Sequence, residues 1–191
     1  MKINKGEAGY LNAKTKQAIL KTILEFASVL LIFAVGYITT KTRLNILTVA
    51  AVLGCLPASR ALVSVIMLVP RKSIDQEKAK EIQTYAKDLT VIYDMVLTSY
   101  EEVSPVDCIV IYDHIVCGYT KNQKTDENYV SSYIKKMLLQ NNYDRITVKI
   151  FKDYKAFLNR TEAIASMAES SKDRNRKQED KMKDIILSLS M

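Results

Sequence analysis

Two stretches decide the fold of this chain: AILKTILEFASVLLIFAVGYITT, residues 18–40, and NILTVAAVLGCLPASRALVSVIMLVP, residues 45–70. Each is predominantly apolar over roughly 20 residues, the length that a helix needs to cross the hydrocarbon core of a bilayer. Neither shows the polar stripe, recurring about every 3.6 residues, that marks a surface helix of a soluble protein. A buried helical hairpin of a soluble core is the alternative, but such helices have shorter apolar runs. Because few residues separate the stretches, we expect a membrane α-hairpin of two antiparallel transmembrane helices, at about 18–40 and 45–69.

The basic charge of the chain is concentrated beside these stretches. The formal net charge is +7; residues 1–70 hold eight Lys/Arg against two Asp/Glu, which leaves 20 against 19 for the other 121 residues. A basic surface for nucleic acid is therefore not required, and we expect no nucleic-acid partner. Five Lys/Arg precede or enter the first stretch, five follow the second between Arg71 and Lys87, and two lie in the loop. Since cytoplasmic flanks are the richer in Lys/Arg, both termini are predicted to face the cytoplasm from a bacterial inner membrane.

The second stretch contains GCLPASRALVSV, residues 54–65, which places a proline and an arginine in the middle of an apolar run. An arginine near the centre of a span costs about 2.5–3.5 kcal/mol. In an antiparallel hairpin, Glu25 lies within about one helical turn of the depth of Arg60. We expect these two residues to pair, within one hairpin or between neighbouring copies; the alternative is an arginine that snorkels from a plain anchor. A helix kink and close helix packing are predicted at three further residues of the stretch: Gly54, Pro57 and Ser59.

Residues 71–168 have the composition of a soluble domain, which we expect to be a cytosolic α/β domain with the element order αβββαβα. The β-branched segment 106–122 is too long for one ordinary strand, and Asp113-His114 divides it into a hairpin. Thr125 is the expected N-cap of the next helix. The other elements are expected at residues 74–88 (helix), 89–100 (strand), 101–105 (turn), 145–151 (strand) and 152–169 (helix).

The two ends of the chain are expected to lie outside this domain. Residues 1–17 form a cytosolic N-terminal segment, and residues 169–191 form a charged linker followed by a short helix. That helix could close the domain, bind a neighbouring copy or lie on the membrane. An apolar face of this length binds lipid weakly, so we favour a protein contact.

The order αβββαβα, over roughly residues 75–167, resembles the core of the restriction-endonuclease-like PD-(D/E)xK nuclease family. In that family, an acid on the second strand and a (D/E)xK motif on the third hold a divalent metal, and the lysine helps to activate water. The resemblance implies that Asp107, at the start of the second strand, and Lys121, at the end of the third, belong to such a site.

The chain departs from this pattern at one position. The residue two places before Lys121 is Tyr119, where the family has an acid. Asp113 at the hairpin turn or Glu127 on the next helix could replace that acid, and Glu81 on the first helix could contribute. The alternative is that Asp107 is a strand-end acid and Lys121 a solvated lysine, with no metal site.

Other catalytic chemistry has no pattern in this sequence. The chain has five glycines, no Gly-rich phosphate loop and a single histidine, His114. Its three cysteines are odd in number and lack metal-ligand spacing, so we expect a reducing compartment without disulfides or a zinc site. No cofactor is expected, apart from a divalent metal if the protein is a nuclease.

Three functions are compatible with these observations. In the first, the hairpin anchors a non-enzymatic cytosolic domain that binds a protein or small-molecule ligand and self-associates as a homo-oligomer in the lipid bilayer. In the second, the domain senses a ligand and oligomerised hairpins form a pore or disrupt the membrane, an arrangement similar to that of small two-span effectors of bacterial defence. In the third, the protein is a membrane-tethered, divergent metal-dependent nuclease.

Overall fold

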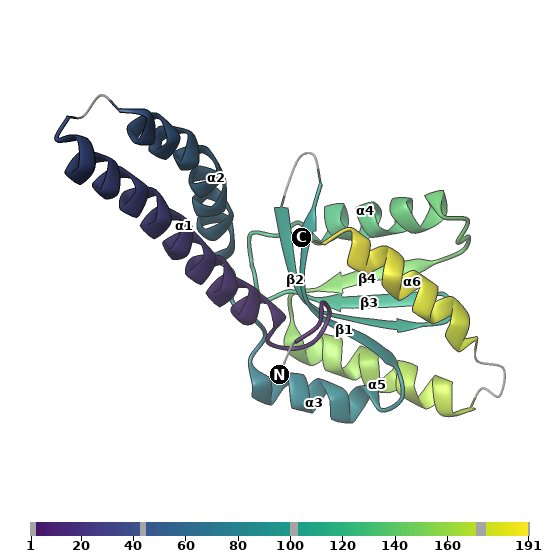
Figure 1. Cartoon of the computed structure of the whole chain (residues 1–191). Helices are drawn as coiled ribbons and strands as arrows, with labels where there is room; N and C mark the ends of the chain where they lie inside the picture. Colours follow the sequence, from purple (N-terminus) through teal and green to yellow (C-terminus); the bar gives the residue numbers. More distant parts are fainter. Residues whose placement is uncertain (1–2, 43–44, 100–102, 171–174, 191) are drawn as a thin grey trace. The chain divides into compact units, whose positions relative to one another are not determined.

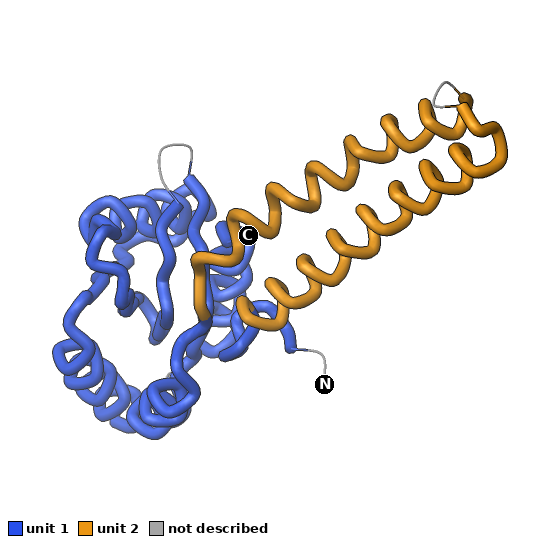
Figure 2. Tube along the Cα trace, turned by 90° about the vertical axis from the view of Figure 1, so that its left-hand side faces the viewer, with its two compact units in different colours: residues 1–10, 73–191 blue, residues 11–72 orange. Residues whose placement is uncertain are grey.

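The computed structural model describes residues 3–42, 45–99, 103–170 and 175–190, and the chain forms two compact units (Figures 1 and 2). One unit is residues 11–72, and the other joins residues 1–10 to residues 73–191. The grouping differs from the expected one, because the first ten residues and the C-terminal helix belong to the α/β unit.

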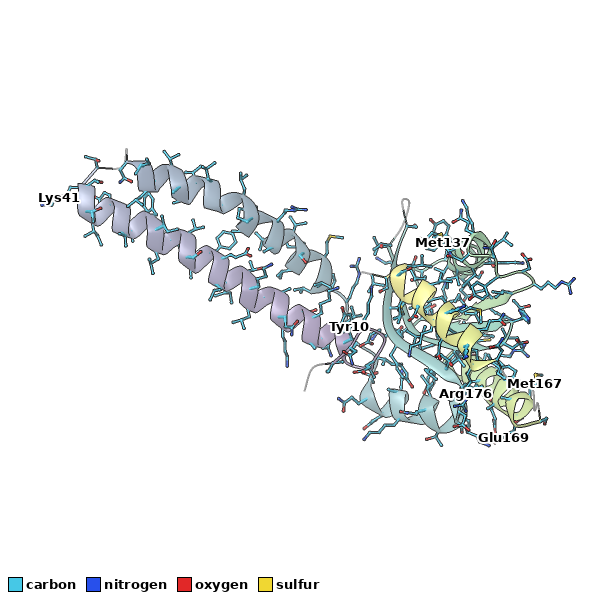
Figure 3. The ribbon with its side chains drawn as sticks, turned by 45° about the vertical axis from the view of Figure 1, so that its right-hand side comes forward. Tyr10, Lys41, Met137, Met167, Glu169 and Arg176 are labelled. Atoms are coloured by element: carbon cyan, nitrogen blue, oxygen red, sulfur yellow. The ribbon has the colours of Figure 1, made fainter. Side chains whose placement is uncertain are left out.

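The unit of residues 11–72 is the expected hairpin of two long apolar helices, α1 (Tyr10–Thr40) and α2 (Ile46–Leu68). Helix α1 begins eight residues earlier than predicted, since the polar segment 10–17 continues the helix instead of ending it. The Asn45 side chain caps α2 by accepting the backbone N–H of Thr48 at 2.8 Å. In the most apolar 18-residue window of each helix, the buried share is only 6% for α1 and 11% for α2. Figure 3 shows the resulting apolar side chains along α1, between the labelled Tyr10 and Lys41. Two exposed apolar helices of this length are compatible with membrane insertion.

Small residues let the two helices of the hairpin approach closely. A Cβ atom added to Gly54 would lie 3.0 Å from Val29 Cγ2, and one added to Gly36 would lie 2.8 Å from Leu47 Cβ. Ala58, one turn after Gly54, is completely buried. Gly54 therefore lies against Val29 of α1, in small-residue packing of the kind found between membrane helices.

The α/β unit contains one mixed sheet in the order β1-β2-β3-β4. Strands β1, β2 and β3 are antiparallel neighbours, with the Asp113-His114 turn between β2 and β3 as predicted, and β4 lies parallel to β3. A parallel neighbour requires a crossover, which α4 provides. The elements follow the expected order: α3 (Gln76–Ala86), β1 (Thr90–Thr98), β2 (Val103–Tyr112), β3 (Ile115–Tyr119), α4 (Glu127–Gln140), β4 (Thr147–Phe151), α5 (Tyr154–Ser170) and α6 (Arg176–Ser188).

Helices cover both faces of this sheet (Figure 1). Helices α3 and α5 pack on one face, over a core that includes Ile82, Cys117 and Phe157. Helices α4 and α6 pack on the other face, over a core that includes Ile134 and Met182. The C-terminal helix, one of whose expected roles was to close the domain, therefore does so.

Both ends of the chain cover the outer edge of β1. The backbone N–H of Tyr93 donates to the carbonyl of Gly6 at 2.8 Å, and Leu97 forms a β-bridge with Ser190. Gly6 has φ +92°, and a Cβ atom there would lie 3.0 Å from Leu187 Cδ2 and 3.2 Å from Ile92 Cγ2, so only glycine fits without strain. An exposed strand edge invites pairing with another chain, and these segments block it.

Three local predictions concern the N-cap of α4, the turn before β2 and the linker before α6. The N-cap of α4 is Asp126, whose carboxylate accepts the N–H groups of Asn128 and Tyr129, and not Thr125, whose hydroxyl is buried without a hydrogen-bond partner in the described part of the chain. The turn expected at 101–105 is shorter, because β2 already begins at Val103; residues 101–102 lie outside the described residues, as do residues 171–174 of the expected linker.

Candidate functional site

Asp94 and Asp107 are two buried acids that face each other across strands β1 and β2. The pairs Tyr93↔Cys108 and Met95↔Val106 enclose them, and their exposed fractions are 2% and 6%. At this point the regular alternation of side chains is interrupted: Tyr93 belongs to the core under α3 and α5, whereas Met95 belongs to the core under α4 and α6. Asp94 has φ +56°, a conformation that Asp and Asn tolerate better than other non-glycine residues.

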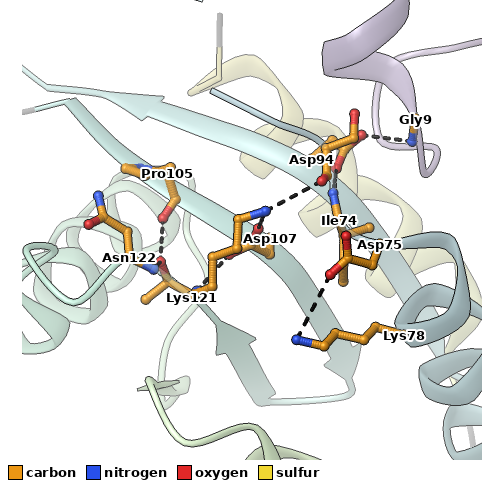
Figure 4. Close-up of polar contacts among 11 residues, drawn as sticks. Gly9, Ile74, Asp75, Lys78, Asp94, Pro105, Asp107, Lys121 and Asn122 are labelled. Atoms are coloured by element: carbon orange, nitrogen blue, oxygen red, sulfur yellow. Dashed lines mark hydrogen bonds and ion pairs between the residues drawn. The ribbon is translucent and has the colours of Figure 1, made fainter. Parts of the chain in front are cut away.

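The carboxylate of Asp94 holds two distant backbone segments (Figure 4). Its Oδ1 accepts the N–H of Ile74 at 2.8 Å, and its Oδ2 accepts the N–H of Gly9 at 2.8 Å. Gly9, with φ +94°, directly precedes α1, and Ile74 lies on the connection between α2 and α3. Because a buried carboxylate is stable only when its oxygens have donors, these two contacts also stabilise the acid itself. Asp94 therefore binds both segments that lead from the sheet to the hairpin sequence.

Asp107 and Lys121, the two residues that the nuclease resemblance singled out, form an ion pair. The ammonium of Lys121 lies 3.3 Å from Oδ1 of Asp107, and the backbone N–H of Lys121 donates to Oδ2 at 2.7 Å. The same ammonium donates to the carbonyl of Ser73 at 3.4 Å. Both carboxylate oxygens of Asp107 are thus engaged by Lys121, and this pair also holds the segment that follows α2.

Tyrosines fill the space beside this pair, where the family motif has an acid. The ring of Tyr119 meets Tyr154 edge-on at 5.2 Å between centroids. Burial, followed by the charges of Asp107, Asp75 and Asp153, raises the pKa of the Tyr119 phenol, so it stays neutral at physiological pH. The hydroxyl of Tyr154 donates to Glu81 at 2.7 Å, so Glu81 is engaged away from Asp107.

The other two predicted acids lie on other elements than Asp107. Asp113 lies at the β2–β3 turn, at the opposite end of β3, with φ +46° and its Oδ1 3.7 Å from Nε2 of His114. Glu127 is the first residue of α4, which packs on the face of the sheet opposite to α5. Over residues 3–42, 45–99, 103–170 and 175–190, no group of three or more His, Cys, Asp or Glu side chains is placed to hold a metal ion. The described residues that the resemblance implied therefore do not fit a divalent metal, because no three acidic side chains gather there and Lys121 neutralises Asp107.

Glu25 and Arg60, the two residues predicted to pair, form no ion pair with each other within one described hairpin. The Glu25 carboxylate lies 3.7 Å from the ammonium of Lys21, one turn away on α1, and its Oε2 is buried without a hydrogen-bond partner within the described residues. The side chain of Arg60 is exposed on α2. Ser59 donates to the carbonyl of Cys55 at 2.7 Å. A pair between Glu25 and Arg60 of neighbouring copies stays a prediction, as does a kink at Pro57, which lies within α2.

Comparison of this chain with protein-family models, curated proteins and solved structures found no match.

The cysteines are free, as expected, with Cys108 and Cys117 buried and Cys55 exposed. Asp94 was missed by sequence reasoning. Its signal was an acid in the middle of the β-branched run TVIYDMVLT, where a buried charge must have partners.

Proposed function

We propose that the protein is a two-pass membrane protein, with both termini in the cytoplasm, that presents a non-enzymatic α/β domain for ligand binding and self-association. The observation that carries this proposal is the exposure of apolar side chains along both helices of the hairpin, for example 70% for Leu24, 71% for Ile38 and 84% for Ile46. Side chains of this size gain about 1.5–3 kcal/mol each when they leave water, so water is an unfavourable solvent for these helices.

The lengths of the helices support the same proposal. A helix rises about 1.5 Å per residue, so the 23 residues of α2 span about 34 Å, close to the thickness of the hydrocarbon core. Helix α1 has 31 residues and is longer, and its extra residues, 10–17, are polar and include Lys14 and Lys16. We assign this extension to the lipid headgroup region, where Lys favours the cytoplasmic side.

The acids of the α/β unit support a binding domain in preference to a metal-dependent hydrolase. Asp94 and Asp107 use their carboxylate oxygens to hold the backbone at Gly9, Ile74 and Lys121. Carboxylates whose oxygens already accept hydrogen bonds from the backbone are poor candidates for metal ligands or general bases. Their place in the protein is to hold both connections to the hairpin on the sheet.

Arginine substitutions on the hairpin test membrane insertion. The double variant Leu30→Arg/Leu31→Arg places two charges at positions that are each 65% exposed. In a span this costs about 5–7 kcal/mol, and the variant is expected to leave the membrane fraction or be degraded. The matched control, Ala13→Arg/Gln17→Arg, adds the same charges to the polar extension of α1 and should stay in the membrane after a carbonate wash. If both double variants fractionate as the wild type does, the hairpin is not a membrane span, since exposed positions of a soluble helix accept arginine at little cost.

Self-association is supported by the exposed charge of Arg60, which one hairpin leaves without an acidic partner among the described residues. A neighbouring copy can offer Glu25, and an intramembrane charge gains most from such a partner. We expect the wild type to be oligomeric in mild detergent and Arg60→Leu to form oligomers of lower mass. The control Lys41→Leu, at the end of α1, should keep the mass of the wild-type oligomer. If the oligomers also conduct ions in liposomes, the domain belongs to a pore-forming effector; oligomers without ion flux indicate an anchor.

A further inference from the structure

A pocket of about 200 Å³ lies where β3, β4 and α5 meet, away from Asp94 and Asp107. Strands β3 and β4 are parallel, and the pairs Ile115↔Thr147 and Cys117↔Lys149 put these side chains in rows across the sheet. Helix α5 packs on the face that carries Cys117 and contributes Arg160 (Figure 1). The lining residues are Ile115, Val116, Cys117, Thr147, Lys149, Phe151 and Arg160.

The lining of this pocket combines two cations with an apolar floor and has no acid. Within the described residues, neither Lys149 nor Arg160 forms an ion pair. The ammonium of Lys149 lies 5.0 Å from the centroid of the Phe151 ring, so it stands over the pocket's aromatic wall. Burial raises the pKa of the Cys117 thiol, and three effects oppose that rise: the charge of Arg160, a hydrogen bond from the Arg160 side chain and the charge of Lys149. The thiol itself stays protonated and neutral.

Two cations that have no acidic partner among the described residues select an anion at this small pocket, and the remaining walls select its shape. The planar guanidinium of arginine matches a carboxylate with two parallel hydrogen bonds, and the lysine adds a point charge. Ile115, Cys117 and Phe151 offer no strong donor, so an ion that must be solvated on all sides, such as inorganic phosphate, is poorly served there. The volume is below the roughly 300 Å³ at which pockets for drug-sized ligands begin, so the ligand is small.

We propose that this pocket binds a small organic carboxylate, with its charge between Lys149 and Arg160 and its apolar body against Ile115, Cys117 and Phe151. Thr147 also lines the pocket, and we expect its hydroxyl to supply a further donor. This inference rests on the ligand-binding part of the proposed function and names the chemistry of the ligand.

The test uses the full-length protein in detergent micelles and benzoate as the probe. Calorimetric titration should give saturable binding of benzoate, weaker binding of benzamide, which has the same body without the charge, and no competition by inorganic phosphate at equal concentration. Lys149→Gln and Arg160→Gln should each weaken benzoate binding by roughly tenfold or more, because each removes a hydrogen-bonded charge. Lys155→Gln, which changes an exposed lysine of the same helix α5 that does not line the pocket, should bind benzoate as the wild type does.

Other outcomes overturn the proposal. It is wrong if benzoate does not bind, if benzamide binds equally well, or if phosphate at equal concentration abolishes the heat of benzoate binding. It is equally wrong if both Gln variants bind as tightly as Lys155→Gln does. Arg160 is half-buried, so its variant could lose its fold; Lys149 is exposed on an edge strand, and Lys149→Gln with an unchanged circular dichroism spectrum decides the matter alone. Because binding is measured in micelles, its failure leaves the membrane topology untouched, and a failure of membrane insertion leaves the pocket untouched.

Discussion

Asp94→Asn is the substitution that most directly tests how the α/β unit holds the segments leading to the hairpin. The variant keeps the size of the side chain and tolerates φ +56°, so it isolates the chemistry of the carboxylate. One oxygen still accepts an N–H, but the new NH₂ group must face the other, at Gly9 or Ile74, donor to donor.

The expected cost follows from these contacts. A hydrogen bond to a charged group contributes about 1.5–3 kcal/mol, and leaving a buried N–H without an acceptor costs about 1–3 kcal/mol. Asp94 is 2% exposed, so water cannot take over the lost contact without local opening. We therefore expect local opening at one or both segments to become easier by about 1–3 kcal/mol, which corresponds to a roughly 5- to 150-fold loss of amide-exchange protection.

Hydrogen–deuterium exchange of the full-length protein in micelles measures this loss. Peptides covering residues 3–10 and 72–78 should exchange faster in Asp94→Asn, and peptides from β2 and β3 should change little. The control is Asp75→Asn, which alters an acid next to Ile74. The side chain of Asp75 is 71% exposed, and its carboxylate makes a long contact of 4.0 Å with the ammonium of Lys78. Equal exchange in both variants and the wild type would refute the role assigned to Asp94.

Three further predictions concern stability and metals. Burial raises the pKa of the Tyr93 phenol and of the Cys108 thiol, so the folded state keeps protons that the unfolded chain releases above about pH 8.5 for Cys and about pH 10 for Tyr. The stability that these two groups contribute is therefore complete below those pH values and falls as pH rises, by about 1.4 kcal/mol per pH unit for each group. In alkaline denaturation, the free energy of unfolding of Tyr93→Phe should fall less steeply with pH than that of the wild type. An identical slope would contradict this. Gly118→Ala places a Cβ atom 2.6 Å from Ile150 Cδ1 and should cost about 1–2 kcal/mol, seen as a lower thermal midpoint; an unchanged midpoint would mean that Ile150 turns away freely. Mg²⁺ or Mn²⁺ at millimolar concentration should shift the thermal midpoint of the wild type by no more than it shifts that of Asp107→Asn; a rise confined to the wild type would restore a metal site at Asp107.

The parts of the fold that local sequence pattern controls could be predicted. The hairpin follows from apolar length, and the β2–β3 turn follows from Asp113-His114 in a β-branched run. Once that turn is fixed, the register Cys108↔Tyr119 brings Asp107 beside the residues that precede Lys121, so this pair was predictable too. The alternative of a solvated lysine and a strand-end acid is only half right, because Lys121 is 44% exposed but Asp107 is buried.

The parts that depend on distant contacts could not be predicted. Asp94 acquires its role from Gly9, 85 residues away, and from Ile74, and nothing in the strand sequence names those partners. The same holds for α6, whose Met182 and Ile186 are fully buried in the core although they follow a charged segment that resembles a linker. Glu179 of α6 is 1% exposed and accepts a hydrogen bond from the hydroxyl of Thr90 at 2.9 Å. Composition alone does not predict this contact. The anion pocket likewise arises only when Arg160 is packed over the pair Cys117↔Lys149.

Cysteine labelling in spheroplasts tests the central claim, the two-pass topology with the α/β domain in the cytoplasm. In a Cys55→Ala background, whose remaining cysteines are buried, Lys41→Cys reports on the end of α1 and Lys124→Cys on the exposed surface of the α/β domain. A membrane-impermeant maleimide applied to spheroplasts should label Lys41→Cys at once and Lys124→Cys only after the membrane is dissolved. Labelling of Lys124→Cys in intact spheroplasts, or protection of Lys41→Cys until the membrane is dissolved, would contradict the account.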